Sequence, residues 1–171
     1  MSLHMIGPGK LSPEVVNAVV EIPYGSRIKY EIDHVTNMVR VDRVLYSPIH
    51  YPAEYGFIPR TLAPDGDPCD ILVLIAGATY PGVLIEARPI GILRMVDDKG
   101  QDDKILSVAA SDPNYMHVET LADLPPHLLR ELEHFFLTYK NLEAKDVHSN
   151  GWEGKEASRA FIEQCTLAYR D

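Results

Sequence analysis

The chain has 171 residues, of which 46% are hydrophobic and 24% charged, a composition typical of a globular protein rather than a disordered one. Sixteen Lys and Arg stand against 25 Asp and Glu, a formal charge of −9. This balance argues against a nucleic-acid binder, which would need basic residues to contact phosphates. An acidic chain can still handle a phosphorylated substrate when divalent cations mediate. The length predicts a single domain over residues 1–171.

The cysteine usage and the hydropathy bear on the compartment. Cys69 and Cys165 lie far apart in the sequence and outside any metal-type spacing, so we expect two free thiols in a reducing setting. No apolar stretch has the length of a membrane span, and the N-terminus lacks the apolar segment of a signal peptide. We therefore expect a cytoplasmic protein with no membrane partner.

The first two-thirds of the chain predict strands. Residues 15–23 are rich in β-branched side chains, 27–33 and 38–46 alternate apolar with charged residues, and 71–75 (ILVLI) predicts a strand buried on both faces. Residues 83–97, the DDKG turn and residues 102–110 predict a bent strand, a hairpin and its return. Tyr55 falls in an aromatic, Pro-rich stretch that we expect to be a loop.

Two helices are predicted late in the chain. Residues 127–143 place one apolar stripe on a helix that Pro126 would open: Leu128, Leu132, Phe135, Phe136, Tyr139 and Leu142. Residues 154–170 have a weaker stripe: Ala157, Phe161, Cys165 and Ala168. Strands first and helices afterwards predict an α+β domain, a small twisted β-barrel with helices packed outside.

Residues 65–75 (DGDPCDILVLI) place three aspartates in front of the buried strand. Alone they suit a solvated turn, because Asp, Gly and Pro dominate turns. A calcium-binding EF-hand loop is excluded, since Cys69, Asp70 and Ala76 occupy the positions that would need an acid, Gly and Glu. Phosphatases that form an aspartyl phosphate also use Asp-x-Asp, but after a buried strand rather than before one.

Further charges interrupt the predicted strands and turns. They include Lys29 and Glu31 on one face of a strand, Arg43, Glu21 at a strand end, and the hairpin residues Asp97, Asp98, Asp102, Asp103 and Lys104. Each alone suits a solvated face or a hairpin tip. If one rim of a barrel gathers them, however, the carboxylates suit Mg²⁺ and the cations suit phosphate.

Five blocks of the sequence occur in the order of one known family. They are VEIPYGSRIKYEID, VDRVLYSPIHYPAEYGFIPRTLAP, DGDPCDI, RMVDDKGQDDK and HFFLTYKNLE. DGDPCDI resembles the signature Asp-x-Asp-Pro-x-Asp of the soluble family I inorganic pyrophosphatases of bacterial type, and the similarity runs from about residue 8 to 171. The resemblance implies a small closed five-stranded β-barrel (OB-like) with flanking helices. It also implies a homohexameric inorganic diphosphatase that uses several Mg²⁺ ions, with Mn²⁺ or Zn²⁺ as substitutes.

The resemblance further implies a role for each matching residue. The metal ligands would be Asp65, Asp70, Asp97, Asp102, Glu31 and Glu21, with Asp65, Asp70 and Asp102 sharing the tightest ion. Asp67 would be the general base acting on a metal-activated water that attacks phosphorus in line, and Tyr55 would support the centre. The substrate would contact Lys29, Arg43, Lys104, Tyr139 and Lys140.

Some features depart from the family or keep alternatives open. Cys69 stands at a usually aliphatic position, where a buried thiol can pack as a small hydrophobe. Residues 144–150 (AKDVHSN) put a local strand in doubt, and 111–120 have no firm counterpart. Tyr139 and Tyr55 also suit packing, and His134 suits the core or a subunit contact. The rivals are a phosphohydrolase of nucleotides or phosphate esters, and a non-catalytic oligonucleotide-binding barrel, which the acidic composition disfavours.

Overall fold

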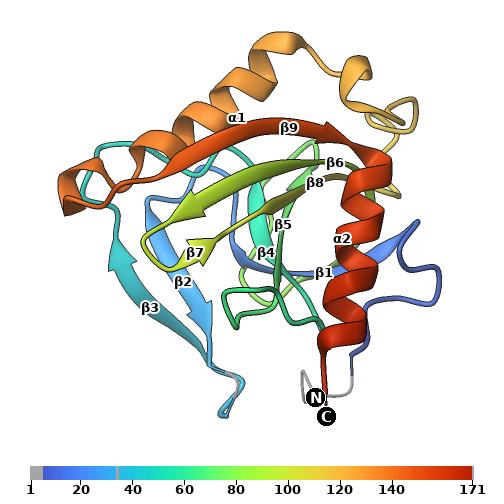
Figure 1. Cartoon of the computed structure of the whole chain (residues 1–171), viewed down its shortest axis with the longest axis horizontal. Helices are drawn as coiled ribbons and strands as arrows, with labels where there is room; N and C mark the ends of the chain where they lie inside the picture. The colour runs from blue at the N-terminus through green and yellow to red at the C-terminus, as the bar shows by residue number, and fades with distance from the viewer. Residues whose placement is uncertain (1–5, 34, 171) are drawn as a thin grey trace.

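The structure is a computed structural model in which residues 6–33 and 35–170 are described. Its strands are β1 (Val16–Ile22), β2 (Ile28–Ile32), β3 (Val39–Val44), β4 (Glu54–Ile58), β5 (Cys69–Leu74), β6 (Leu84–Asp97), β7 (Gly100–Gln101), β8 (Lys104–Ala109) and β9 (His148–Gly154). The helices are α1 (Pro126–Thr138) and α2 (Lys155–Ala168), with short 3₁₀ helices at Leu121–Asp123 and Asn141–Glu143. Figure 1 shows their arrangement.

Five strands close on one another in a ring. β1 pairs with β4 and β4 with β5, both antiparallel, and β5 pairs with β8 in parallel. β8 then pairs with β6, which returns to β1. The 14-residue strand β6 changes register between Pro89 and Gly91 and between Arg94 and Met95, so it bends and reaches several neighbours. The predicted α+β class, with five strands closed on one another, is confirmed.

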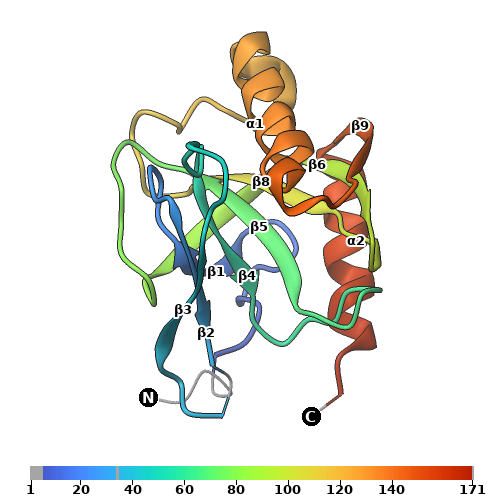
Figure 2. The same ribbon diagram turned by 90° about the vertical axis from the view of Figure 1, so that its left-hand side faces the viewer.

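Strand β5 packs against both sides of the molecule, as its apolar run predicts. Leu72 and Leu74 belong to a buried cluster that includes residues of α1, whereas Ile71 and Val73 belong to a second cluster that includes residues of α2. The two helices accordingly lie against different sides of the ring (Figure 2). Burial on both faces holds the strand in place, including Asp70 at its start, and the segment with Asp65 and Asp67 directly precedes it.

The helices differ from their predicted stripes at the C-terminal ends. Helix α1 starts at Pro126 as predicted and buries Leu132, Phe135 and Phe136, but Leu142 is 64% exposed because the chain leaves the α-helical period after Thr138. In α2, Phe161 and Cys165 are buried as predicted, whereas Ala168 is exposed and Ser158 and Ile162 are buried instead. No helix within the described ranges 6–33 and 35–170 is both long and apolar enough to span a bilayer.

Strands β4 and β9 differ from two sequence predictions, that Tyr55 lies in a loop and that the helices follow all the strands. Tyr55 lies on β4 rather than in a loop, and β4 runs so close to β1 that a Cβ on Gly56 would lie 1.9 Å from the carbonyl oxygen of Val19. In the segment 144–150, where a local strand was in doubt, residues 148–150 belong to strand β9, which begins at His148 and pairs with β6. Because β9 lies between α1 and α2 in the chain, the helices do not all follow the strands.

Strands β2 and β3 form a separate two-stranded sheet beside the ring (Figure 1). Alternation alone would place Val39, Val41 and Leu45 on one face, but Val39 and Val41 are exposed, whereas Leu45 just beyond β3 is buried. Lys29 pairs with Arg43, but Tyr30 pairs with Val41. Asp42 is therefore the extra residue of a β-bulge, where the regular alternation of side chains along β3 is interrupted.

Candidate active site

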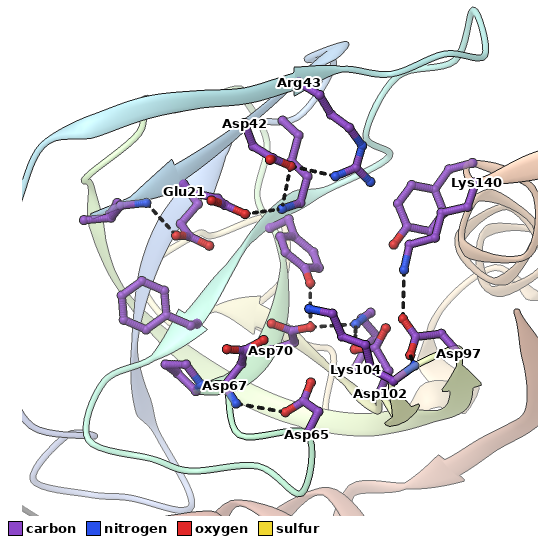
Figure 3. Close-up of a pocket in the computed structure, with 18 of the residues that line it drawn as sticks. Glu21, Asp42, Arg43, Asp65, Asp67, Asp70, Asp97, Asp102, Lys104 and Lys140 are labelled. Carbon is purple, nitrogen blue, oxygen red and sulfur yellow. Dashed lines mark hydrogen bonds and ion pairs between the residues drawn. The ribbon is translucent and has the colours of Figure 1, made fainter. Parts of the chain in front are cut away.

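A cavity of about 520 Å³ lies between the β2–β3 hairpin and the ends of several ring strands. Every residue that the sequence resemblance assigns to the site lines it: Glu21, Lys29, Glu31, Arg43, Tyr55, Asp65, Asp67, Asp70, Asp97, Asp102, Lys104, Tyr139 and Lys140. Figure 3 shows many of these side chains turned toward a common space. The fold thus collects groups that are as far apart as residues 21 and 140 in the chain, while their individual roles remain predictions.

The centre of the site is the buried lysine Lys104, whose side chain is 2% exposed. Its Nζ donates to Oδ2 of Asp70 at 2.6 Å and to Oδ1 of Asp102, and the hydroxyl of Tyr55 donates to the same Asp70 oxygen at 2.5 Å. Asp70 and Lys104 are paired neighbours on the parallel strands β5 and β8. The ammonium also lies 5.7 Å from the ring centroids of Tyr55 and Phe136, within reach of cation–π attraction.

Burial shifts the ionisation of this central group. Loss of solvation raises the pKa of Asp102 to about 6, because Lys104 offsets the burial only in part and Asp70 adds a second negative charge. For Lys104, burial favours the neutral form, but the two carboxylates outweigh it and raise its pKa. Burial also raises the pKa of Tyr55, which keeps this phenol a hydrogen-bond donor.

The aspartates before β5 belong to a tight turn with a positive φ of 91° at Gly66, a conformation that glycine adopts readily. The backbone N–H of Asp67 donates to Oδ1 of Asp65 at 3.1 Å, and the Asp67 carbonyl accepts from Ala63 N–H at 2.8 Å. Burial raises the pKa of Asp65. The turn chemistry that explains Asp-Gly-Asp as a solvated loop is thus present, and both carboxylates also border the cavity.

The wall next to α1 carries Tyr139 and Lys140. Lys140 Nζ forms an ion pair with Oδ2 of Asp97 at 2.8 Å. Burial opposes the charge on Asp97, but Lys140 and the backbone N–H of Lys99 lower its pKa. Tyr139 stacks on Phe135 with 5.3 Å between the ring centroids, so it both packs against α1 and borders the cavity.

The opposite wall is the β2–β3 hairpin. Lys29 Nζ contacts Oε1 of Glu31 at 2.7 Å and Oδ2 of Asp42 at 3.2 Å. Arg43 pairs with the same Asp42 oxygen at 2.6 Å and, through Nε, with Glu143 at 2.9 Å. Each cation that the resemblance assigns to phosphate therefore has carboxylate partners.

Glu21, at the end of β1, lies deeper between the walls. Its Oε1 accepts from the backbone N–H of Ile32 at 2.8 Å, which ties β1 to β2. Burial raises the pKa of Glu21 to about 7 even though this hydrogen bond opposes the shift, and the charge of Asp70 adds to it. Glu21 can therefore carry a proton near neutral pH.

Comparison with known proteins identifies the family. The family described as inorganic pyrophosphatase matches residues 18–170. The chain belongs to the inorganic pyrophosphatase family. An inorganic pyrophosphatase of Haloferax volcanii is 48% identical over 164 residues, covering 95% of this chain and 93% of that protein. One of Nostoc sp. is 47% identical over 163 residues, covering 95% and 96%. The crystal structure of the Thermus thermophilus inorganic pyrophosphatase superposes with a TM-score of 0.96 at 42% identity over all of both chains.

The family resemblance implies Mg²⁺, so the side chains of the cavity can be compared with what a metal ion needs. Among the described residues, no three His, Cys, Asp or Glu side chains lie close enough together to hold one as they stand. Lys104 occupies the space between Asp70 and Asp102, and the Asp65 carboxylate accepts a hydrogen bond from the backbone N–H of Asp67. Within the described chain, however, no hydrogen bond engages Oδ1 of Asp70 or Oδ2 of Asp102, so each carboxylate keeps one oxygen for an ion.

The charge balance of the cavity also suits cations. Among the described residues its lining contains ten carboxylates and seven Lys or Arg side chains. An excess of negative charge in a partly buried space is unfavourable unless cations enter, because like charges repel strongly at low effective dielectric. All-oxygen donors and surplus negative charge are what hard divalent ions require.

Sequence reasoning missed some charged residues of the site. Asp42, Arg40 and Lys145 line the cavity, and Glu143 holds Arg43. Alternation places Arg40 and Asp42 on the face opposite Val39 and Val41 but does not show that this face borders the cavity, and the β-bulge at Asp42 lets Arg43 border it as well. Glu143 lies in the 3₁₀ helix after α1, where no periodic pattern marks its direction.

Proposed function

We propose that the protein is an inorganic diphosphatase that hydrolyses pyrophosphate to two phosphates with Mg²⁺, which Mn²⁺ or Zn²⁺ can replace. The observation that carries this proposal is the single cavity in which ten carboxylates face seven cationic side chains, on a chain that belongs to the pyrophosphatase family. Carboxylates alone would suit only metals and cations alone only phosphate. The combination suits a metal–polyanion complex.

The proposed metal ligands are Asp65, Asp70 and Asp102 for one ion, Asp97 for an ion entering with substrate, and Glu21 and Glu31 near a more solvated one. Their support is the oxygen donor set around the cavity and the unengaged oxygens of Asp70 and Asp102. When bound, such ions lower the pKa of water and neutralise charge on phosphoryl oxygens.

Asp67 is the proposed general base. Its backbone is fixed by the turn, and no hydrogen bond within the described residues engages its carboxylate. A carboxylate free of a cation can accept a proton from water placed at the cavity mouth. Asp70, in contrast, is held by Tyr55 and Lys104 and suits a fixed ligand rather than a base.

The two walls are proposed to hold the two phosphates. Lys29 and Arg43 project from the β2–β3 hairpin and Tyr139 and Lys140 from the end of α1. Their carboxylate partners keep the cations ordered before substrate arrives, which limits the reorganisation needed on binding. Fixed positive groups around the phosphoryl oxygens then stabilise the charge of the transition state.

The direct test is phosphate release from pyrophosphate, p-nitrophenyl phosphate and ATP, each with Mg²⁺ and with EDTA. We expect Mg²⁺-dependent release from pyrophosphate and little from the other two. A preference for ATP or the phosphate ester would favour the rival phosphohydrolase and overturn the proposal. Salt-sensitive binding of single-stranded oligonucleotides without any phosphate release would instead favour the non-catalytic barrel.

We further propose one domain over residues 1–171, a cytoplasmic location and a homohexamer. The single-domain proposal is supported by β5, which contributes to both buried clusters. The location is supported by Cys69 and Cys165, which are buried free thiols. Sedimentation equilibrium at several protein concentrations tests the hexamer, and a mass below six chains would refute it.

A further inference from the structure

Asp103 lies between two residues of the proposed site but does not line the cavity. Asp102 and Lys104 do line it, whereas the Asp103 side chain is 2% exposed and packed behind them. Successive side chains of an extended segment point to opposite sides, so Asp103 faces away when its neighbours face the cavity. A buried carboxylate is unfavourable unless it has partners, which makes its surroundings informative.

Three donors surround the Asp103 carboxylate. Oδ2 accepts from Arg94 Nη1 at 2.7 Å and from Gln101 Nε2 at 2.6 Å, and Oδ1 accepts from the backbone N–H of Met95 at 3.0 Å. These donors come from β6 and β7, the strands on either side of the turn that follows Asp97. The carboxylate therefore ties together both arms of the hairpin that supplies part of the site.

The contact with Met95 repairs a gap in the sheet. β6 pairs with β7 as far as Val96 opposite Gln101, and with β8 from Leu93 opposite Lys104. Between these pairs, the Met95 carbonyl accepts from Asp102 N–H at 2.9 Å, while the Met95 N–H reaches a side chain instead of a backbone carbonyl. The Asp103 side chain thus ties the backbone between Asp102 and Lys104 to strand β6.

Arg94 connects this anchor to the rest of the fold. Its Nη2 contacts Glu153 on β9 at 2.9 Å, and its guanidinium carbon lies 5.6 Å from the ring centroid of Phe161 on α2. The arginine is therefore held on the side of the sheet that faces away from the cavity. Through it, Asp103 is fixed to β9 and α2 rather than to any group of the site.

We propose that Asp103, held by Arg94, is a positioning residue that presents Asp102 to a divalent cation and keeps Lys104 between Asp70 and Asp102. The inference rests on the proposed function. Because Asp103 is covalently between the two residues, a rotation of its backbone would move both at once. Its side chain does not line the cavity, so its effect on a bound ion would pass through Asp102 and Lys104.

The test compares Asp103→Asn and Arg94→Met with Glu153→Gln, a matched control that removes only the outer ion pair of Arg94. Asparagine keeps an acceptor for Met95 but turns an N–H₂ donor toward other donors. Calorimetric titration of each substrate-free protein with Mn²⁺ is expected to show at least about tenfold weaker binding for the first two variants, in the range found when outer partners of metal ligands are removed. Glu153→Gln is expected to bind like the unaltered protein.

Unfolding midpoints, kcat and KM for pyrophosphate complete the design. Weaker Mn²⁺ binding with a lower kcat that excess Mg²⁺ partly restores supports positioning. Unchanged Mn²⁺ affinity, kcat and KM overturn it, even if the midpoint falls, because the role is then purely structural. If Asp103→Asn does not fold, the same measurements are made on Arg94→Lys, which keeps the positive charge but loses the planar guanidinium, and the same outcomes support or overturn the proposal. An unaltered protein that neither binds Mn²⁺ nor releases phosphate overturns the proposed function, and this inference with it.

Discussion

Replacing Lys104 by methionine tests whether the centre of the site is held by charge. Methionine preserves the length and the apolar stem but leaves Asp70 and Asp102 without their shared ammonium. Removing one partner of a buried ion pair costs about 3–5 kcal/mol, because the remaining charge stays buried without compensation. We place Lys104→Met in this range, since two carboxylates lose their partner and the lysine is fully enclosed.

The measurement is urea unfolding in EDTA, followed by the fluorescence of Trp152, the chain's single tryptophan. Lys10→Met is a suitable control, because Lys10 is an exposed lysine and an exposed charge contributes about 0–1 kcal/mol at most. Excess Mg²⁺ is expected to recover much of the loss, because a ligand that binds only the folded state stabilises it. If Lys104→Met unfolds at the same urea concentration as Lys10→Met, the charge reasoning is wrong.

The stability lost in Lys104→Met should also depend on pH in a defined direction. Burial already raises the pKa of Asp102 to about 6, and removing Lys104 takes away a charge that lowers it. A carboxyl with a raised pKa binds more protons in the folded state, so its folded state loses stability as the pH rises through that pKa. The difference in unfolding free energy between Lys104→Met and the unaltered protein should therefore be larger at pH 8 than at pH 5.

Four further substitutions separate the proposed roles. Asp67→Asn should lower turnover by roughly 10²–10⁴, the usual contribution of a general base, while Mn²⁺ affinity by calorimetry stays nearly unchanged; near-native turnover refutes the assignment. Asp70→Asn should instead weaken Mn²⁺ binding clearly, and an unchanged titration counts against a ligand role. Arg43→Lys should weaken inhibition by inorganic phosphate if its planar fork matters, and equal inhibition shows that it does not. Gly56→Ala should cost at least about 1–3 kcal/mol in urea unfolding because its Cβ meets the β1 backbone, whereas Gly77→Ala, with no atom within 4 Å of the added Cβ, is the control that should not.

Local patterns predict the parts of this fold that depend on neighbours in the sequence. The apolar run of β5 and the buried residues Phe135 and Phe161 follow from periodicity alone. Strand β4 does not, because its aromatic sequence EYGFI suits a loop as well as a strand until β1 and β5 are placed on its two sides. Close packing against Val19 explains the glycine at 56, and no sequence window contains that information.

The site shows the same division. Its membership was predicted by the resemblance, and all thirteen residues line one cavity. Asp42 was missed because alternation places it with Arg40 without showing that this face borders the cavity, and Asp103 was grouped with the charged hairpin although alternation turns it away from Asp102 and Lys104. Alternation assigns residues to faces, but which face borders the cavity depends on how the strands pack together, and the register break at Asp42 brings Arg43 to the same cavity as Arg40 and Asp42.

The internal ion pairs of the cavity explain how the same residues can serve two opposite ligands. Lys104 pairs with Asp70 and Asp102, Lys140 with Asp97, and Lys29 with Glu31. Every proposed metal ligand in these pairs is thus bound to a cation proposed to contact substrate. A complex of divalent ions with a polyanion can replace all of these pairs together, since its cations satisfy the acids and its phosphates satisfy the lysines. Either component alone leaves one set of buried charges unpaired, so metal and polyanion are expected to strengthen each other's binding.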